Sequence, residues 1–475
     1  MNKIILVLLL VTTVSISITH AQDIVGDWNG TIKTESFQLG FSFQIEKKSE
    51  SYISRMDIPK QGVKGIAIKK TTFEDSTLRF DASDLGILYE GIFKGNKIIG
   101  KFVQGGKSYD MDLSRGALLE QRRSQEPIKP YRGFSQDVFF RNEKDSITLA
   151  GTLSLPSKNG NFPVVILISG SGPQNRDGEI MGHKPFLVIA DYLVQNGIGV
   201  LRFDDRGVFK SEGNFLTATT NDFATDVVAA IAYLKTNAGV DKNRIGLVGH
   251  SEGGIIASLI AANSKDINLV ILLASSGLSG DQLLLLQKRK MMEAVAINAN
   301  DIRKSTDFIE GAYRIIKASS TSEVAKAKLS EYMALVWNDI PSFEKGTMSM
   351  QEYSSFFVKQ LTGKWLYSFI KLDPSIALKK IKCPVLAING GNDLQVPPKE
   401  NLKAIKDALT IAKNRNFNIL EIPHLNHLFQ ESVTGLPDEY GTIDQTFSPI
   451  VLNELKLWIE KNGPRVSHPS SKNYK

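Results

Sequence analysis

The chain has 475 residues, of which 42% are hydrophobic, 23% charged and 8% aromatic. This composition excludes an intrinsically disordered chain, and the length predicts two domains, because hydrophobic cores stop growing near about 250–300 residues. The formal net charge is +7, but no basic stripe interleaved with aromatic residues occurs, so we expect no nucleic-acid partner. Cys383 is the only cysteine, which excludes an internal disulfide framework and a cysteine-rich metal site.

Residues 1–21 have the pattern of a secretory signal peptide. Lys3 precedes the apolar run Ile4–Val11, and small residues lead to Ala21. The run is too short for a permanent anchor, and no later stretch reaches the roughly 18 uninterrupted apolar residues of a transmembrane helix. We therefore expect export to the periplasm or the medium after cleavage near Ala21, with no permanent membrane anchor.

Residues 22–115 alternate apolar and polar side chains, which predicts a small all-β domain. Between Phe37 and Ile45 every second residue is apolar, so these side chains share one face of a strand. Gly95-Asn96 separates two such runs as a hairpin turn. The opening segment Gly26-Asp27-Trp28 resembles the start of lipocalin-like barrels, and we expect either a barrel or a sandwich.

Residues 116–134 are poor in apolar side chains and show no period, which predicts a linker between the two domains. Pro127 and Pro130 lie within this segment. At the other end of the chain, residues 464–475 are expected to form a polar tail.

Residues 135–463 change to short apolar runs that alternate with amphipathic helical segments. Such runs fill a parallel sheet that is covered on both faces, so we predict an α/β fold with a doubly wound, mostly parallel sheet. Helical residues from about 280 to 378 interrupt the alternation and are expected to form a cap. The apolar runs are Val164–Ile168, Gly199–Phe203, Ile245–Val248, Leu269–Leu273, Val385–Ile388 and Ile419–Ile422.

The segment Gly249-His250-Ser251-Glu252-Gly253 follows one of these apolar runs and precedes a helical segment. A Gly-x-Ser-x-Gly motif in this context is typical of a nucleophile elbow, in which the serine sits on a cramped strand-to-helix turn. The helix N-terminus favours negative charge that develops nearby. We therefore predict that Ser251 is a catalytic nucleophile.

A serine nucleophile requires a histidine base and a carboxylate that orients it. Asp393 directly follows a predicted buried strand and its turn glycines, so it is the candidate acid. His424 and His427 both follow the last predicted strand. We predict His427 as the base because it lies on a projecting loop after Asn426, whereas His424 lies at the strand end.

An oxyanion hole needs two backbone N–H donors directed at one point. The residue after the nucleophile, Glu252, is expected to provide one of them. The glycine-rich loop Ser169-Gly170-Ser171-Gly172-Pro173 follows the strand that ends at Ile168. We predict that the Ser171 N–H is the second donor.

Together these segments resemble the α/β-hydrolase superfamily, and within it bacterial exported serine esterases with a β-rich N-terminal domain. The resemblance includes Arg202–Gly207, a structural turn by our interpretation, and the pair Asn426-His427. It implies hydrolysis of a small-molecule carboxylic ester through an acyl-enzyme, without a cofactor or a metal. One departure is Ser169, which occupies a position where many relatives have histidine.

Two alternative functions remain open at this point. A serine peptidase of the prolyl-oligopeptidase type shares the fold, but its propeller blades need about 40 residues each, and residues 22–115 are too few to build one. The second alternative is a non-catalytic lipid- or glycan-binding protein. Such a protein would not need catalytic residues, whereas serine, aspartate and histidine occupy all three triad positions in this chain. The sequence leaves the acyl and alcohol groups of the substrate and the oligomeric state open.

Overall fold

The computed structural model describes residues 23–33, 38–58, 63–104, 107–116 and 123–462. The chain divides into two compact units between Glu120 and Gln121. The predicted signal peptide at 1–21 and the predicted tail at 464–475 lie outside the described residues.

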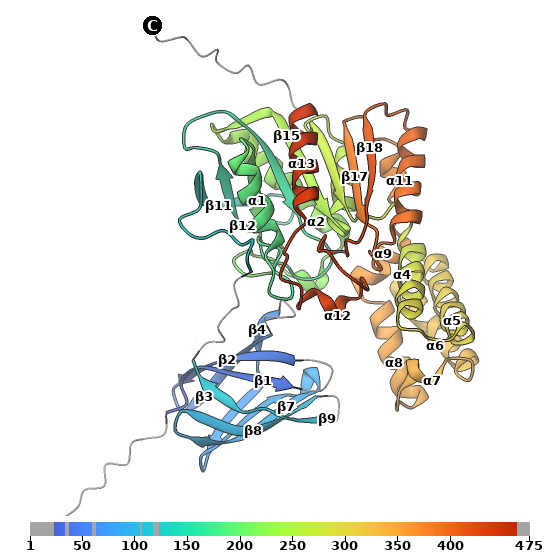
Figure 1. Cartoon of the computed structure of the whole chain (residues 1–475). Helices are drawn as coiled ribbons and strands as arrows, with labels where there is room; N and C mark the ends of the chain where they lie inside the picture. The colour runs from blue at the N-terminus through green and yellow to red at the C-terminus, as the bar shows by residue number, and fades with distance from the viewer. Residues whose placement is uncertain (1–22, 34–37, 59–62, 105–106, 117–122, 463–475) are drawn as a thin grey trace, which may run out of the picture. The chain divides into compact units, whose positions relative to one another are not determined.

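The first unit is a closed antiparallel barrel (Figure 1). Its strands follow the order β10-β1-β2-β3-β5-β6-β7-β8-β9, and β10 also pairs with β8, which closes the ring. The all-β prediction is confirmed, and of the two expected architectures the barrel is the one observed. The strands are β1 (Gly26–Lys33), β2 (Gln38–Lys48), β3 (Ser51–Ile58), β4 (Val63–Ala67), β5 (Lys70–Glu74), β6 (Thr77–Ala82), β7 (Ile87–Lys94), β8 (Lys97–Gln104), β9 (Lys107–Asp110) and β10 (Leu113–Arg115).

The barrel interior is filled by inward-facing aromatic and aliphatic side chains. Trp28 is fully buried, and its indole Nε1 donates a 2.8 Å hydrogen bond to the carbonyl oxygen of Ile24. The guanidinium of Arg115 lies 4.6 Å from the centre of the Trp28 ring. Trp28 is therefore a core residue of the barrel, with its one polar atom satisfied by the main chain.

The second unit contains an eight-stranded sheet of order β11-β12-β14-β13-β15-β16-β17-β18. β11 and β12 pair antiparallel, β12 and β14 pair antiparallel, and the remaining pairs are parallel. This mostly parallel, doubly wound sheet confirms the predicted fold class. The strands are β11 (Phe134–Asn142), β12 (Ile147–Leu155), β13 (Phe162–Ile168), β14 (Gly199–Phe203), β15 (Val240–His250), β16 (Leu269–Leu273), β17 (Val385–Gly390) and β18 (Phe417–Ile422).

Helices cover both faces of this sheet, as the buried apolar strands require. On one face α1 (Pro185–Gln195) and α13 (Pro449–Asn462) share a core with the strands. On the other face α2 (Thr220–Thr236), α3 (Glu252–Ala261) and α11 (Pro398–Ile411) form a second core. The parallel strands end at a common edge between the helix layers, and ligands of open α/β sheets bind at that edge.

A helical cap interrupts the sheet between β16 and β17, with its own apolar core. Its helices are α4 (Gly280–Ala294), α5 (Ala299–Ala318), α6 (Ser322–Val336), α7 (Ser342–Lys345), α8 (Met350–Leu361) and α9 (Lys364–Lys371). The following short helix α10 (Ser375–Leu378) packs into the sheet core through Leu378. The cap therefore ends near Lys371, a few residues before the predicted boundary.

Part of the predicted linker belongs to the second unit. Arg123 Nη2 donates a 2.6 Å hydrogen bond to the carbonyl of Gly441, and Gln125 Nε2 donates at 2.8 Å to the carbonyl of Phe447. The Gln125 Oε1 atom in turn accepts from the backbone N–H of Thr446 at 2.6 Å. The sequence did not indicate these contacts because the partners are more than 300 residues apart in the chain.

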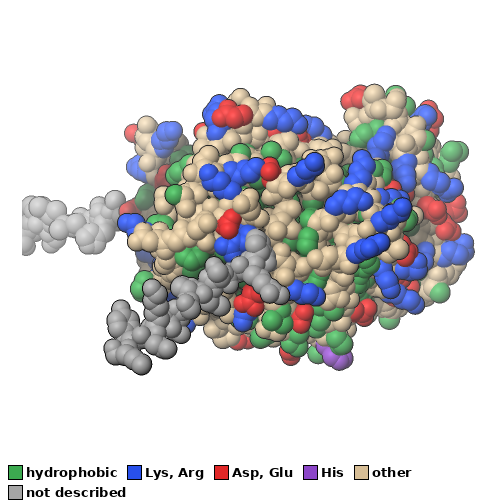
Figure 2. All heavy atoms as spheres, turned by 90° about the horizontal axis from the view of Figure 1, so that it is seen from above, with side chains coloured by type: hydrophobic (Ala, Val, Ile, Leu, Met, Phe, Trp, Pro, Cys, Tyr) green, Lys and Arg blue, Asp and Glu red, His purple; other side chains and the backbone are tan. Residues whose placement is uncertain are grey.

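The surface shown in Figure 2 carries Lys and Arg side chains with Asp and Glu among them. None of the helices in the described part of the chain has both the length and the apolar character needed to cross a bilayer. Within the same residues, no group of three or more His, Cys, Asp or Glu side chains is placed to hold a metal ion. Burial raises the pKa of the Cys383 thiol to about 11, which keeps it protonated and unreactive at neutral pH.

Candidate active site

Ser251 lies on the tight turn between β15 and α3. Its backbone has φ 54° and ψ −119°, a region that residues with a side chain rarely occupy. The Ser251 N–H donates a 2.8 Å hydrogen bond to the carbonyl of Leu273 at the end of β16, which fixes the turn to the neighbouring strand. This geometry is that of a strained nucleophile elbow.

The glycines around Ser251 are required by close backbone contacts. A Cβ atom at Gly249 would lie 2.1 Å from the carbonyl oxygen of Gly253, and one at Gly253 would lie 2.2 Å from that of Ile168. Both distances are shorter than any real Cβ contact, so the turn closes only with glycine at these positions. The second contact also brings the end of β13 against the elbow.

His427 and Asp393 form a buried hydrogen-bonded pair. His427 Nδ1 lies 2.8 Å from Asp393 Oδ2, and the two residues are 5% and 2% exposed. The other carboxylate oxygen, Asp393 Oδ1, accepts hydrogen bonds of 2.8 Å from the backbone N–H groups of Gln395 and Val396. These bonds fix the carboxylate after β17, where it orients the imidazole ring.

The loop after β18 gives the two candidate histidines different environments. Asn426 Oδ1 accepts from the backbone N–H groups of Leu428 and Gln430, and this compact turn presents the His427 ring to Asp393. His424 is exposed, and no hydrogen bond among the described residues joins it to Asp393. The geometry required of the base is met by His427.

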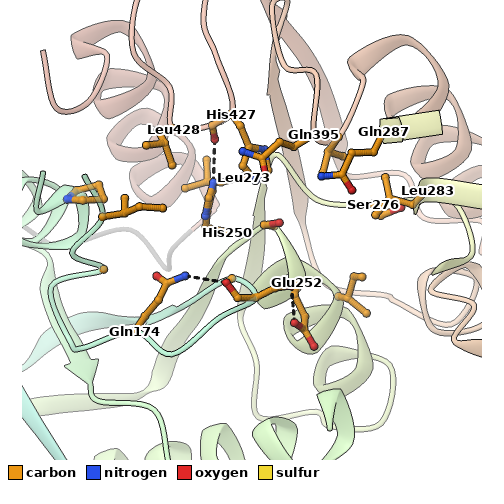
Figure 3. A pocket seen from close by; sticks show the side chains of 18 of the residues that line it. Gln174, His250, Glu252, Leu273, Ser276, Leu283, Gln287, Gln395, His427 and Leu428 are labelled. Carbon is orange, nitrogen blue, oxygen red and sulfur yellow. Dashed lines mark hydrogen bonds between the residues drawn. The ribbon is translucent and has the colours of Figure 1, made fainter. Parts of the chain in front are cut away.

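Ser251 and His427 line one cavity of about 210 Å³ (Figure 3). The cap contributes Leu283 and Gln287 from α4 and Trp365 from α9 to its walls. No hydrogen bond joins the Ser251 hydroxyl to His427 among the described residues. Such bonds are often long without substrate and tighten in the reacting complex.

The loop after β13 lies directly beside Ser251. A Cβ atom at Gly170 would lie 3.1 Å from the Cβ of Ser251. Neither the N–H of Ser171 nor the N–H of Glu252 has a hydrogen-bond acceptor among the described residues. Two free donors therefore lie near Ser251, one in this loop and one at the start of α3, as an oxyanion hole requires.

Asp205 holds the same loop at two points. Its Oδ1 accepts from Ser169 Oγ at 2.5 Å and its Oδ2 accepts from the Gln174 N–H at 3.0 Å. Burial raises the pKa of Asp205 to about 8, and the nearby carboxylates of Asp226 and Glu252 add to the effect. Ser169, the departure noted in the sequence, is thus a hydrogen-bond partner of a buried acid.

His250, the residue before Ser251, links the elbow to the His427 loop. Its Nε2 lies 2.9 Å from the carbonyl oxygen of His427, so this nitrogen carries the proton and donates. Burial, and to a lesser extent the neighbouring His427, lowers the pKa of His250 to about 3, and the ring is neutral at ordinary pH. This contact could not be predicted from the sequence, because nothing in the local motif specifies the partner of His250.

The turn after β14 is structural, as interpreted from the sequence. The guanidinium of Arg176 donates to both carboxylate oxygens of Asp204, at 3.1 Å from Nε and 2.8 Å from Nη2. Arg206 Nε donates to Asp226 Oδ2 at 2.7 Å. None of these four residues lines the cavity that holds Ser251.

The side chains of Glu252 and Trp365 have roles at the cavity that were not predicted from the sequence, which indicated only the backbone N–H of Glu252. The Glu252 carboxylate is buried and accepts several hydrogen bonds, one of them from the indole of Trp365 in the cap. The sequence contained one indication for the Glu252 side chain. An acidic residue directly follows Ser251, at the start of a helix that is expected to be buried. Trp365 carried no comparable signal, because the cap has no motif.

The sheet order, the elbow after β15 and the placement of Asp393 and His427 after later strands define the protein as an α/β-hydrolase. Residues 183–431, just over half of the chain, match the family described as serine aminopeptidase, S33 (Hydrolase_4). The chain belongs to this family and is a hydrolase.

Two similar proteins and two solved structures add to this comparison. Esterase EstD of Thermotoga maritima is 26% identical over 317 residues, which cover 66% of this chain and 66% of that protein. An uncharacterized 31.7 kDa protein in the traX-finO intergenic region of Escherichia coli is 21% identical over 277 residues, 56% of this chain and 85% of that protein.

The structure of the Pyrococcus furiosus esterase Pf2001 shares 18% identity and a TM-score of 0.40 with this chain, and the match covers 69% of this chain and 93% of that structure's chain. Est1E of Butyrivibrio proteoclasticus with bound ferulic acid shares 16% identity and a TM-score of 0.40, with coverages of 68% and 98%.

Proposed function

We propose that this hydrolase is a serine esterase that cleaves small-molecule carboxylic esters through an acyl-enzyme. Ser251 is the nucleophile, His427 the base and Asp393 the acid that orients it. The observation that carries the proposal is the 2.8 Å hydrogen bond between His427 and Asp393 at the cavity that also contains the strained Ser251. A Thermotoga maritima relative named as an esterase supports the same reaction class.

In the proposed reaction, His427 Nε2 accepts the proton of the Ser251 hydroxyl while the oxygen attacks the ester carbonyl. The N–H groups of Ser171 and Glu252 stabilise the oxyanion of the tetrahedral intermediate. The C–O bond to the alcohol then breaks, and the alcohol leaves with the proton from His427. Water, activated by the same histidine, hydrolyses the acyl-Ser251 ester and restores the free enzyme.

The cavity walls favour a neutral ester with an apolar part. Among the described residues no Lys or Arg lines the cavity, and most of its lining is aliphatic or aromatic. Three glutamines provide neutral hydrogen-bonding groups at the cavity, and one of them, Gln287, belongs to α4 of the cap; the others are Gln174 and Gln395 (Figure 3). An anionic substrate would enter this cavity without a cation to compensate its charge.

The description of the family as serine aminopeptidases supplies a second candidate function. An aminopeptidase needs a free carboxylate to bind the substrate ammonium. Of the acidic residues in the described part of the chain, Glu252 is the one that lines the cavity, and its oxygens already accept from Ser171, Thr220 and Trp365. Asp393 is occupied by His427 and two backbone donors. The esterase function therefore has the stronger support.

The test compares p-nitrophenyl acetate, butyrate and octanoate with leucine and alanine p-nitroanilides, using the full chain. We expect ester hydrolysis with kcat/KM at least about a hundredfold above that for the anilides. A fluorophosphonate probe, located by peptide mass spectrometry, should label Ser251. Faster anilide hydrolysis, or labelling at another serine, would contradict the proposal.

We further propose that the protein is exported. The support is the sequence pattern of residues 1–21, with one lysine before a short apolar run. N-terminal sequencing of the protein from the periplasm or the medium of a bacterial host should give a chain that begins near Gln22. A cytoplasmic protein that retains Met1 would contradict this expectation.

A further inference from the structure

The Glu252 side chain is a buried carboxylate immediately after the nucleophile. It is 3% exposed, and none of the salt bridges of the described residues involves it. Burying a carboxylate is costly unless hydrogen bonds satisfy its oxygens. Its position at the first turn of α3 provides part of the compensation, because a helix N-terminus favours negative charge.

Three hydrogen-bond donors from three separate elements complete the compensation. Ser171 Oγ, in the loop after β13, donates to Glu252 Oε2 at 2.7 Å. Thr220 Oγ1, at the start of α2, donates to Oε1 at 2.6 Å. Trp365 Nε1, in helix α9 of the cap, lies 3.0 Å from Oε1 and 3.2 Å from Oε2.

The first of these contacts bears on the oxyanion hole. Ser171 belongs to the loop that Asp205 holds through Ser169 and Gln174. Between these two points, the Ser171 hydroxyl is tied to Glu252. The position of the Ser171 N–H relative to Ser251 therefore depends on the Glu252 carboxylate.

The third contact bears on the cavity wall. The Trp365 ring stacks on Phe369, with ring centres 5.1 Å apart and planes 23° apart, and both rings line the cavity. The indole N–H is the polar atom of this aromatic pair, and Glu252 accepts its hydrogen bond. The same carboxylate thus joins the elbow, the oxyanion loop and the cap.

The geometry points to Glu252 as a positioning residue of the esterase: its carboxylate aligns the Ser171 oxyanion donor with Ser251 and fixes the cap through Trp365. This inference rests on the proposed esterase function. Glu252 acts through Ser171 and Trp365, while its own backbone N–H is the other oxyanion donor.

The decisive variant is Glu252→Gln, which keeps the size of the side chain but gives one end two N–H donors in place of an acceptor. With p-nitrophenyl acetate we expect kcat to fall about tenfold to a hundredfold, somewhat less than the roughly 10²–10³ lost when an oxyanion donor is removed. KM should change less than about threefold. The rate of fluorophosphonate labelling at Ser251 should fall with kcat, because the phosphonyl oxygen occupies the same hole.

A double-mutant cycle shows whether Glu252 acts through Ser171. Ser171→Ala keeps the backbone N–H and removes only the hydroxyl bonded to Glu252. If the two side chains act as one unit, the double variant Ser171→Ala/Glu252→Gln should lose no more activity than Glu252→Gln alone. Trp365→Phe, which keeps a ring but removes the indole N–H, should lower kcat less than Glu252→Gln does.

The matched control is Glu344→Gln in the cap. Glu344 is also a mostly buried carboxylate, bonded to Lys288 and Ser305, and does not line the cavity. This variant should lower the melting temperature without changing kcat. Melting curves of all variants separate loss of fold from loss of alignment.

Two results would overturn the inference while the esterase function stands. The first is that the fluorophosphonate labels Ser251 at the same rate in the wild type and in a folded Glu252→Gln variant. The other is full additivity of the Ser171→Ala and Glu252→Gln losses. A wild type that neither hydrolyses esters nor reacts at Ser251 would instead overturn the proposed function and this inference with it.

Discussion

Trp28 and Trp365 represent two different uses of one residue type in the two units. The Trp28 indole donates to the carbonyl of Ile24, only four residues away, within a barrel that is filled by side chains. The Trp365 indole donates to a carboxylate 113 residues away, and its ring borders a cavity. In the barrel the polar atom is satisfied locally and the residue stabilises a core. In the hydrolase unit the same atom helps to hold distant elements around an open site.

The largest expected effect follows from removing the nucleophile. Ser251→Ala should lower kcat for p-nitrophenyl acetate by about a million-fold, as for other serine nucleophiles, while circular dichroism and the melting curve show an intact fold. More than about one per cent residual activity in a folded variant would show that the chemistry does not depend on Ser251. The cavity in the second unit would then not be the active site, and the comparison of Trp28 with Trp365 would no longer be one of a core residue with an active-site residue.

The second prediction distinguishes the two histidines after β18. His427→Ala should lose nearly as much activity as the serine variant, because it removes the ring bonded to Asp393. His424→Ala should lose at most about tenfold, since this side chain is exposed. Kinetics of the two purified variants test the ranking, and the reverse order would move the base to His424.

The third prediction tests the barrel side of the comparison. Trp28→Ala removes a fully buried ring from the barrel core and should cost about 3–5 kcal/mol of barrel stability. Because Ser251, Asp393 and His427 and the two proposed oxyanion donors all belong to the second unit, kcat at 25 °C should remain within about twofold of wild type. Calorimetry and esterase kinetics on the same sample provide both values. A parallel loss of kcat would mean that the site depends on the barrel.

The fourth prediction concerns Asp205 and depends on pH. Its pKa is about 8 in the folded chain against 3.8 for an unperturbed aspartate, so between these values the unfolded chain has lost a proton that the folded chain keeps. This group therefore progressively lowers the stability of the folded state as pH rises from about 4 to about 8, with no further loss above pH 8. Asp205→Asn should remove the dependence. Its melting temperature relative to wild type should rise between pH 5 and 8, and a constant difference would contradict the raised pKa.

Much of the fold was predictable because the spacing of apolar residues along the chain reflects which faces of a strand or helix are buried. Alternation marked the barrel strands, and the apolar runs from Val164 to Ile422 marked the sheet, since each pattern follows from how many faces of a strand are covered. The elbow was also predictable, because its backbone contacts leave no room for a Cβ atom at positions 249 and 253. The sequence therefore has glycine at both positions.

The remainder depended on contacts between residues far apart in the chain. The anchoring of Gln125 to Phe447 and the bond from His250 to the His427 carbonyl each join segments without any shared local pattern. The same holds for Trp365 and Glu252, because a tryptophan in an amphipathic cap helix is compatible with many packing partners. Sequence identified the strand ends where the candidate triad residues lie, and tertiary packing determined which groups surround them.

The strained backbone of Ser251 has a consequence for how such a molecule can change. At φ 54° and ψ −119°, any residue with a Cβ pays a conformational penalty that glycine avoids. Ser251→Gly should therefore raise the free energy of unfolding by about 1–2 kcal/mol while it removes the hydroxyl. Selection for stability alone would favour glycine at this position. If Ser251 is the nucleophile, as proposed, its retention is a case in which stability is given up for activity.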